Sequence, residues 1–411
     1  MEFNELEEIV IEQRVEFEKK DSGLERIYEL KKYLNSKQIT VLSGVRRSGK
    51  STLLKQIADR LGNYYYLNFD DERLLEFSVA DFSTLLLVWQ KQLKSRNILL
   101  DEIQNIANWE RFIRRIHDEG YKVFITGSNA KMLSTELATH LTGRYVKVEV
   151  YPFSFREMLK WKSITGEYST VSEKAEIIST YDVYLKQGGF PDYIKYEDSE
   201  FLKRTYDDII YKDIIVRFGI KEIKSFRLLS NYIFSNFTKE ISFNGLKNLL
   251  GFKSSVTVRD YVSFLEESYL VFELNKYDFS LKKQYAAGKK IYVIDNGMRE
   301  QIAFSNSEDR GRLLENLVFL ELKKRNKEIY YFKNKHECDF IVFERNRISS
   351  AFQVTLKLGE NKDRELNGLY EAMDMFELKE GTVISEYEEK KITVDKKKIS
   401  VIPYWKWCIL G

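Results

Sequence analysis

Short apolar runs alternate with amphipathic segments over the first 150 residues of the chain. The apolar runs predict strands at 39–42, 64–69, 97–102, 122–129 and 143–150, and apolar residues recur at helical spacing between them. Residues 1–36 combine many charges with a repeating apolar face, so we expect a helical lead-in packed beside these strands. The alternation predicts an α/β fold with a parallel sheet, helices on its faces and ligand sites at the carboxyl ends of the strands.

The pattern changes twice beyond residue 150. Residues 151–218 predict mostly helices, interrupted by a turn at the segment GGFP, residues 188–191. The pattern then predicts helices at 226–237, 243–250 and 255–268, and a hairpin of strands at 269–276 and 290–294 around a basic turn at Lys282 and Lys283. This order of elements resembles a winged helix-turn-helix.

The final block of the chain mixes both patterns. It predicts a helix at 313–325, strands at 328–333, 338–344 and 350–356, then a further helix and a β-rich end. We therefore expect four parts, at 1–150, 151–218, 219–304 and 305–411.

Composition bounds the class of protein without identifying it. The 411 residues exceed one ordinary core, and 43% hydrophobic with 31% charged residues is typical of a folded protein. A formal net charge of +3 neither indicates nor excludes a nucleic-acid partner. Cys338 and Cys408 lack pairing or metal-ligand spacing, and the acidic N-terminus lacks the features of a signal peptide. No apolar run approaches the ~20 residues that span a membrane, so we expect a cytoplasmic protein without a membrane partner.

The first predicted strand leads into a glycine-rich segment, GVRRSGKS, at residues 44–51. It fits the pattern G-x-x-x-x-G-K-[ST], and a predicted helix follows, which is the context of a phosphate-binding loop. The glycines let backbone N–H groups converge on phosphate oxygens at a helix N-terminus. The expected nucleotide-binding residues are Gly44, Val45, Arg46, Arg47, Ser48, Gly49, Lys50, Ser51 and Thr52. Lys50 would reach the β- and γ-phosphates and Ser51 would bind Mg²⁺, whereas the alternative is a chance match in a strand–turn–helix.

An apolar strand that ends in two acids, Asp101 and Glu102, follows the glycine loop. Hydrolysis of a nucleotide needs one carboxylate for the Mg²⁺ shell and a second group to orient or deprotonate the attacking water. We assign Asp101 to the metal and Glu102 to the water; two solvated acids at a strand end are the alternative. The next strand ends near Asn129, our first choice for a side chain that senses the γ-phosphate, with Ser128 as the alternative.

These residues resemble an ATPase of the AAA+ group, in the P-loop family typical of archaea and many bacteria. Its members join an AAA+-like domain to a winged helix and a C-terminal nuclease-like domain. The segments LTGR at 141–144, YPFSFRE at 151–157, GGFP at 188–191 and YKDI at 211–214 are similar to landmarks of that family. The resemblance implies that Arg144 is an arginine finger, in its own subunit or from a neighbour. The alternative is an arginine that pairs with a surface acid.

The predicted winged helix carries two groups of polar and basic residues. Lys253, Ser254, Ser255, Thr257 and Arg259 gather at the start of its third helix, and Lys276, Lys282, Lys283, Lys289 and Lys290 surround its hairpin. A recognition helix and a basic wing on DNA would have this arrangement. Winged helices also serve as protein-contact modules, so DNA and protein partners both stay open.

The last block resembles a restriction-endonuclease-like fold, and the resemblance implies an acid on the first helix, an aspartate after a strand turn and an acid-x-lysine on the next strand. Glu315 and Asp339 match the first two, whereas Gln353 and Thr355 stand in place of the acid and the lysine. Lys357 lies on the same face of that strand and would be the substitute lysine. Carboxylates hold the metal and lysine polarises water in such chemistry, so these departures disfavour cleavage.

The leading hypothesis is a Mg²⁺-dependent ATPase whose turnover drives a conformational change, coupled to DNA. A nucleotide-gated signalling or assembly protein with protein partners is the alternative. A nuclease licensed by ATP is disfavoured by Gln353 and Thr355, and the Asp101–Glu102 pair argues against a kinase. Oligomerisation is compatible with all of these readings.

Overall fold

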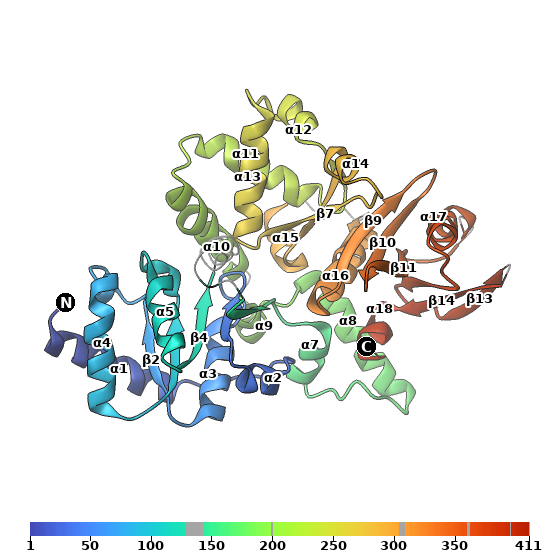
Figure 1. The fold of residues 1–411 in the computed structure, drawn as a ribbon. Helices are drawn as coiled ribbons and strands as arrows, with labels where there is room; N and C mark the ends of the chain where they lie inside the picture. The colour runs from blue at the N-terminus through green and yellow to red at the C-terminus, as the bar shows by residue number, and fades with distance from the viewer. Residues whose placement is uncertain are drawn as a thin grey trace. The chain divides into compact units, whose positions relative to one another are not determined.

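The computed structural model describes residues 1–128, 141, 143–198, 200–303, 309–359, 362–394 and 396–410 (Figure 1). The chain forms two compact units. The first contains Met1–Tyr151 with Glu267–Tyr269, and the second contains Pro152–Glu266 with Leu270–Gly411. The finer division of the second unit into three parts stays a prediction.

A five-stranded parallel sheet forms the centre of the first unit (Figure 1). Its strands are β1 (Ile39–Ser43), β2 (Tyr65–Asn68), β3 (Asn97–Asp101), β4 (Lys122–Gly127) and β5 (Tyr145–Glu149), in the order β2-β3-β4-β1-β5. All neighbouring strands run parallel. The helices are α1 (Phe3–Lys19), α2 (Leu30–Asn35), α3 (Lys50–Leu61), α4 (Phe82–Gln92) and α5 (Trp109–Asp118), with short 3-10 turns at Glu72–Leu74, Val79–Asp81 and Ile103–Asn105. The predicted parallel α/β sheet is confirmed.

The two faces of this sheet have separate hydrophobic cores. Successive side chains of a strand point to opposite faces, so Val41 and Leu42 enter different cores. Val41 packs in a core with α1, α4 and α5, whereas Leu42 packs with α3 and the start of α2. Burial of each large apolar side chain stabilises the fold by roughly 1.5–3 kcal/mol. The near-continuous apolar runs of the strands follow from a sheet that is covered on both faces.

The lead-in before β1 is helical only in part. Residues 20–29 form an extended connection between α1 and α2, so the prediction of a helix was wrong there. The side chain of Gln56 on α3 explains the difference, because its amide donates to the carbonyl oxygens of Ser22 and Leu24, both at 2.7 Å. Its oxygen accepts from the backbone N–H of Arg26 at 3.2 Å. These hydrogen bonds replace the internal bonds of a helix and fix the connection against α3.

The second unit begins with helices and then forms a small sheet. The helices are α7 (Phe155–Trp161), α8 (Val171–Gln187), α9 (Pro191–Tyr196), α10 (Phe201–Asp208) and a π-helix at Ile209–Val216. Next come α11 (Ile223–Ser235), β6 (Glu240–Ile241), α12 (Phe243–Leu250), α13 (Ser255–Glu267), β7 (Val271–Asn275), α14 (Leu281–Ala286), β8 (Lys289–Val293) and α15 (Asn296–Ile302). The strands form an antiparallel sheet in the order β6-β8-β7.

Two details of this sheet differ from the prediction. The two-residue strand β6 was not predicted, because so short a segment shows no alternation of apolar and polar residues. Lys282 and Lys283 lie in the short helix α14 rather than in a turn. The first backbone bond of that helix joins the N–H of Gln284 to the carbonyl oxygen of Ser280 at 3.0 Å.

A mixed sheet with helices completes the second unit. Its elements are α16 (Arg310–Lys324), β9 (Glu328–Lys333), β10 (Glu337–Glu344), β11 (Arg347–Val354), α17 (Lys362–Met375), β12 (Glu380–Ser385), β13 (Lys390–Val394), β14 (Lys397–Pro403) and α18 (Tyr404–Leu410). The strand order is β13-β14-β12-β11-β10-β9, and only the β11–β12 and β12–β14 pairs are parallel. The predicted α/β block at the C-terminal end is confirmed (Figure 1).

A buried asparagine joins α16 to the small antiparallel sheet. The side chain of Asn316 accepts from the backbone N–H of Val293 at 2.9 Å and donates to its carbonyl oxygen at 3.0 Å. It also donates to the side-chain oxygen of Asn296 at 3.0 Å. Buried polar groups are costly unless they are paired, so this asparagine fixes the position of β8 against α16. Among the helices that the structure describes, none is long and apolar enough to cross a membrane.

Candidate functional site

The glycine-rich loop lies at the carboxyl end of β1, between Ser43 and the first residue of α3. Two of its glycines are required by the geometry. A Cβ at Gly44 would lie 2.1 Å from the carbonyl oxygen of Val150, and Gly49 has φ of +94°. The hydroxyl of Ser48 is buried and has no hydrogen-bond partner within the described residues. The loop is therefore a tight cradle with a polar group available to a ligand.

Lys50 lies over this cradle as the first residue of α3. Its side chain is only 4% exposed, and its ammonium donates to the carbonyl oxygens of Gly44 and Val45, both at 3.2 Å. The ammonium also lies 3.8 Å from a carboxylate oxygen of Glu102. The loop lysine and the second acid of the pair are thus neighbours, although they lie far apart in the sequence.

Asp101 is the last residue of β3. The strands β3, β4 and β1 run parallel, so their carboxyl ends lie on the same side of the sheet and Asp101 lies beside the loop. Its carboxylate accepts a hydrogen bond from the hydroxyl of Thr126. Burial raises the pKa of the Asp101 carboxyl, and the charge of Glu102 acts in the same direction, whereas the hydroxyls of Thr126 and Ser51 oppose the shift. Asp101 and Ser51, the two residues expected to hold Mg²⁺, are therefore neighbours.

Glu102 adopts a left-handed backbone conformation, with φ of +52°. Such a conformation costs a residue other than glycine roughly 1 kcal/mol of conformational free energy. The backbone N–H of Glu102 donates to the Thr126 hydroxyl at 2.9 Å, and this hydrogen bond helps to hold the turn. The amide of Gln104 donates to the Glu102 carboxylate and lies 3.4 Å from the Ser128 hydroxyl. The turn after β3 thus connects Glu102 to the end of β4.

Gln104 was missed in the sequence, although a polar residue two positions after an acidic pair was a usable signal. Ser128, the alternative γ-phosphate sensor, is buried beside it. Asn129, the first choice, lies outside the residues that the structure describes. Within the loop, Arg46 is half-buried and Arg47 is exposed.

Arg144 lies near the amino ends of the strands, whereas the loop lies at their carboxyl ends. Its carbonyl oxygen accepts from the N–H of Ile39 at 2.8 Å, at the amino end of β1, whereas the loop follows the carboxyl end. Its guanidinium pairs with Asp118 at the end of α5. In its own chain, Arg144 therefore does not face the loop, and the alternative of a surface ion pair describes its contacts.

Arg26 is a further residue of the loop region that the sequence did not reveal. This arginine is buried, and its guanidinium donates to the carbonyl oxygens of Ser48 at 2.9 Å and Tyr151 at 2.7 Å. It belongs to the extended connection that was predicted to be helical. The guanidinium joins the loop to the chain that follows β5, so it supports the shape of the cradle.

Replacing Arg26 by alanine is expected to weaken ATP binding about tenfold, because each buried hydrogen bond to a charged group contributes roughly 1.5–3 kcal/mol to holding the loop. Titration with a fluorescent ATP analogue measures the effect. Arg60→Ala is the matched control, since Arg60 makes an exposed ion pair with Glu25 and should leave the affinity unchanged. Equal affinities of the two variants would contradict the role given to Arg26.

The donor set fits a magnesium nucleotide. Mg²⁺ is usually held by one or two protein oxygens together with substrate phosphates and waters. Asp101 and Ser51 supply such oxygens, and Lys50 supplies the cation for the phosphates. In the described part of the chain, no group of three His, Cys, Asp or Glu side chains is arranged to hold a metal ion by itself.

A second cluster of charged residues lies in the other unit. The ammonium of Lys290 on β8 lies 2.7 Å from a carboxylate oxygen of Glu337, 3.2 Å from Glu315 and 3.4 Å from Asp339. Glu315 also accepts from the hydroxyl of Tyr292 at 2.7 Å. The structure therefore brings together the two predicted acids of the nuclease-like site, Glu315 and Asp339, around a lysine that was not predicted for it.

The remaining residues predicted for that site have different places. Gln353 is buried on β11, and its side-chain oxygen has no hydrogen-bond partner within the described residues. Lys357 is exposed after the end of β11. Lys290 therefore provides the ammonium that contacts the carboxylates, and Lys357 does not.

Burial raises the pKa of the Asp339 carboxyl to about 7, although the ammonium of Lys290 opposes this shift. For Lys290 itself burial acts to lower the pKa, but the negative charge of its carboxylate neighbours, Glu315 first, outweighs burial and holds the pKa well above its usual value. Lys290 is therefore charged throughout the physiological range of pH.

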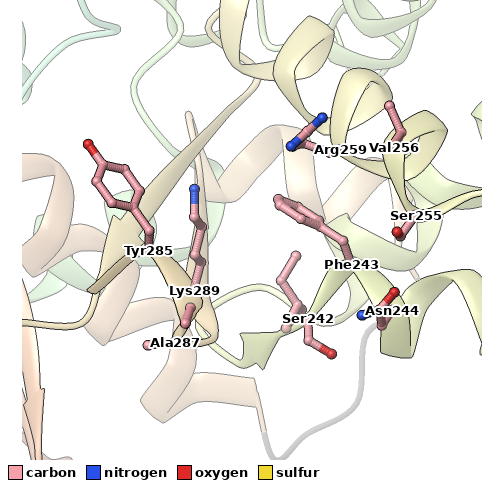
Figure 2. Close-up of a pocket in the computed structure, with 11 residues that line it drawn as sticks. Ser242, Phe243, Asn244, Ser255, Val256, Arg259, Tyr285, Ala287 and Lys289 are labelled. Carbon is pink, nitrogen blue, oxygen red and sulfur yellow. The ribbon is translucent and has the colours of Figure 1, made fainter. Parts of the chain in front are cut away.

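A pocket of about 220 Å³ lies between the start of α12, the start of α13 and the segment from α14 to β8 (Figure 2). Arg259 of α13 and Lys289 of β8 line it, together with Ser242, Ser255 and Tyr285. Figure 2 shows Arg259 extending from α13 toward the side on which Lys289 and Tyr285 lie. Two of the basic residues predicted to meet DNA therefore share one pocket.

Three family models match consecutive parts of the chain. An AAA domain matches residues 36–159, a domain of unknown function (DUF8612) matches 178–309, and a second domain of unknown function (DUF4143) matches 310–407. The AAA domain agrees with the predicted ATPase domain and supports nucleotide binding. It covers the glycine loop, Asp101 and Glu102.

The similarity to solved structures is low. A DnaA from Aquifex aeolicus with bound AMPPCP is 14% identical, with a TM-score of 0.26 over 58% of this chain and 86% of that one. CDC6P from Pyrobaculum aerophilum is 12% identical, with a TM-score of 0.24 over 76% and 94%. With TM-scores below 0.5, these two likenesses carry no argument about function.

Similarity to whole relatives is much higher. An uncharacterized protein of Haemophilus influenzae is 30% identical over 84% of this chain and 89% of its own length. The uncharacterized protein MJ1544 of Methanocaldococcus jannaschii is 37% identical over 98% of this chain and 95% of its own length. The chain therefore belongs to the same protein family as MJ1544, and within it residues 36–159 match an AAA domain.

Proposed function

We propose that the chain hydrolyses ATP in a Mg²⁺-dependent reaction at the edge of the parallel sheet. One observation carries the proposal: Lys50, Ser51, Asp101 and Glu102 meet beside a loop whose shape requires Gly44 and Gly49. Each has the side chain that phosphoryl transfer to water needs at that place. An ordinary strand-end turn would not require this combination of a cradle, a buried lysine and a buried acid.

In the proposed reaction, the ammonium of Lys50 exchanges its two loop carbonyls for phosphate oxygens. Asp101 and the Ser51 hydroxyl would hold the Mg²⁺, which would supply positive charge to the phosphates. Glu102 orients the attacking water and accepts its proton. The hydrogen bonds of Gln104 to Glu102 and toward Ser128 support a positioning role for this glutamine.

Arg144 enters this proposal only as a residue of a neighbouring subunit, because its contact with Asp118 is far from the loop of its own chain. An arginine finger supplied in trans raises turnover by about 10³-fold or more. The rate per subunit should then rise with protein concentration, and Arg144→Ala should abolish that rise without changing ATP affinity. An unchanged rate in the variant removes Arg144 from the mechanism.

We further propose that ATP turnover is coupled to DNA through the region of α12, α13 and the hairpin. The order α11-β6-α12-α13-β7-β8 with its antiparallel sheet supports a winged helix. The pocket with Arg259 and Lys289 supports a contact with the phosphate backbone (Figure 2). Contacts of this kind release counterions, so binding should weaken steeply with salt.

Protein partners are the second candidate for the same region. Exposed apolar side chains favour them, namely Leu249 on α12, Val256 on α13, Phe279 before α14, and Leu281 and Tyr285 on α14. Exposed apolar residues that gather on neighbouring elements are typical of protein-contact surfaces. In this alternative ATP mainly sets the conformation, and turnover is slow and independent of nucleic acid.

The test measures phosphate release with and without duplex DNA at several protein concentrations and salt concentrations. DNA-stimulated turnover that is lost in Arg259→Ala supports DNA coupling. Lys203→Ala is the charge-matched control, because Lys203 is an exposed lysine on α10. Turnover that is indifferent to DNA at low salt favours the protein-partner candidate, and no turnover under any condition contradicts the ATPase itself.

A further inference from the structure

The geometry points to Lys290 as the permanent cation of the cluster formed by Glu315, Glu337 and Asp339, three acids that, as they are arranged around the ammonium in the described part of the chain, do not form a metal site. This inference concerns the second unit and does not depend on ATP hydrolysis. It explains why three carboxylates gather around one point of the fold, and it assigns the terminal α/β block a metal-free role.

The three carboxylates saturate the ammonium group. A lysine ammonium has three N–H donors and no acceptor. Carboxylate oxygens of Glu337, Glu315 and Asp339 lie 2.7, 3.2 and 3.4 Å from the Lys290 nitrogen, so there is one carboxylate for each donor. The Lys290 side chain is only 5% exposed, so water does not compete for these contacts.

The acids make further hydrogen bonds that a metal ion would have to displace. The Glu315 oxygen nearest Lys290 also accepts from the Tyr292 hydroxyl at 2.7 Å. The second oxygen of Asp339 accepts from the backbone N–H of Val354 at 2.9 Å. Among the described residues, the side-chain oxygen of Gln353 is a buried acceptor of this site without a hydrogen-bond partner. One neutral amide oxygen is a poor ligand for Mg²⁺, which is bound mainly through carboxylates and phosphates.

Lys290 is held where it is by its backbone. It lies on β8, the central strand of the small sheet, paired with Glu240 of β6 on one side and Leu274 of β7 on the other. Val293 of the same strand is bonded on both its backbone groups by Asn316. The sheet therefore fixes the backbone of Lys290. The ammonium is held by its three carboxylates and by the burial of the side chain, which is only 5% exposed.

The location of the three carboxylates gives the cluster its role. Glu315 lies on α16, and Glu337 and Asp339 lie on β10, whereas Lys290 belongs to the small sheet. The ion pairs therefore fasten the small sheet to the terminal block without an external ion. A site that already holds its cation has no place for the metal that metal-assisted hydrolysis of nucleic acid requires.

The test is Mn²⁺ binding to the full chain without nucleotide, followed by electron paramagnetic resonance. The wild type and Asp339→Asn are expected to bind Mn²⁺ equally, because the cluster takes up none in either protein. Lys290→Met removes the ammonium and keeps a similar length, so the three acids are no longer held by a cation and become free to turn toward a metal ion. This variant is expected to gain one Mn²⁺ per chain. The double variant Lys290→Met/Asp339→Asn is expected to lose it again.

Thermal unfolding gives a second readout. Mn²⁺ should raise the melting temperature of Lys290→Met by about 5 °C and leave that of the wild type unchanged, since a ligand stabilises only a protein that binds it. Lys289→Met is the matched control, because the neighbouring Lys289 pairs with Glu273 outside the cluster. It should show no response to Mn²⁺.

Two results would overturn the inference. The first is Mn²⁺ binding by the wild type that Asp339→Asn abolishes, or Mg²⁺-dependent cleavage of DNA with the same dependence. The second is a Lys290→Met protein that folds and gains no Mn²⁺. If Asp339→Asn or Lys290→Met does not fold, Glu337→Gln replaces them, because the Glu337 side chain is 31% exposed and tolerates the change more easily. Mn²⁺ binding that the wild type shows and Glu337→Gln lacks would also overturn the inference.

Discussion

Replacing Glu102 by glutamine is expected to lower ATP turnover by about 10²–10⁴-fold, because a group that takes the proton of the attacking water contributes a factor of this size. Glutamine has the same shape but does not accept a proton. ATP should still bind. The Glu102 carboxylate lies 3.8 Å from the Lys50 ammonium and competes with the phosphates for it, so removing this charge does not weaken the contact of Lys50 with the nucleotide. Steady-state phosphate release and nucleotide titration measure the two effects separately.

The matched control is Glu119→Gln, an exposed acid that pairs with Arg115 on α5. It should turn over ATP at the wild-type rate. If Glu102→Gln also keeps the wild-type rate, the water is activated elsewhere and the left-handed turn after β3 has another purpose. If both binding and turnover vanish in Glu102→Gln, the substitution has disturbed the loop, and the assignment of a purely chemical role to Glu102 is wrong.

Replacing Gly44 by alanine is expected to abolish nucleotide binding and to destabilise the first unit by roughly 1–3 kcal/mol or more, the usual range for a side chain forced into a packed space. The new Cβ would lie 2.1 Å from the carbonyl oxygen of Val150, a backbone atom that cannot rotate away, and 3.2 Å from the hydroxyl of Ser48. Either the loop or the chain after β5 has to move, so the cradle no longer fits phosphate.

Chemical denaturation and titration with an ATP analogue check this expectation. Gly359→Ala is the control, because a Cβ at Gly359 meets nothing within 4 Å. Wild-type stability and affinity in Gly44→Ala would mean that the chain after β5 yields without cost, and the close approach of Gly44 to Val150 would then have no functional meaning.

The sequence was sufficient for those parts of the fold that depend on neighbouring residues. The strands β1 to β4 of the parallel sheet each contain an apolar run that ends near polar residues, and both features are local. The same holds for Lys50 and Asp101, because the spacing of the glycine loop and the end of an apolar strand fix their places. Parallel strands then bring their carboxyl ends together, so the meeting of these two residues was predictable.

The parts that could not be predicted depend on contacts between distant segments. A helical pattern over 20–29 gave way because Gln56 bonds the backbone of that connection. Arg26 lies 22 residues before Ser48 in the sequence, and no motif or residue spacing predicts the hydrogen bond between them. Lys357 was expected beside Asp339 from strand alternation, whereas Lys290 of a different sheet lies there. Local patterns determine the elements, but the partners of buried charges follow from packing.

The double hydrogen bond of Asn316 to Val293 has a consequence for dissecting the protein into fragments. The two domains of unknown function meet at residues 309 and 310, which suggests a natural place to cut. A cut there would remove the two hydrogen bonds of Asn316 from Val293 on β8 and would separate Lys290 from its carboxylates. Both halves would then expose unpaired polar groups. We therefore expect the two halves to be insoluble when they are expressed separately. The two domains of unknown function should fold only together and should occur together in related proteins.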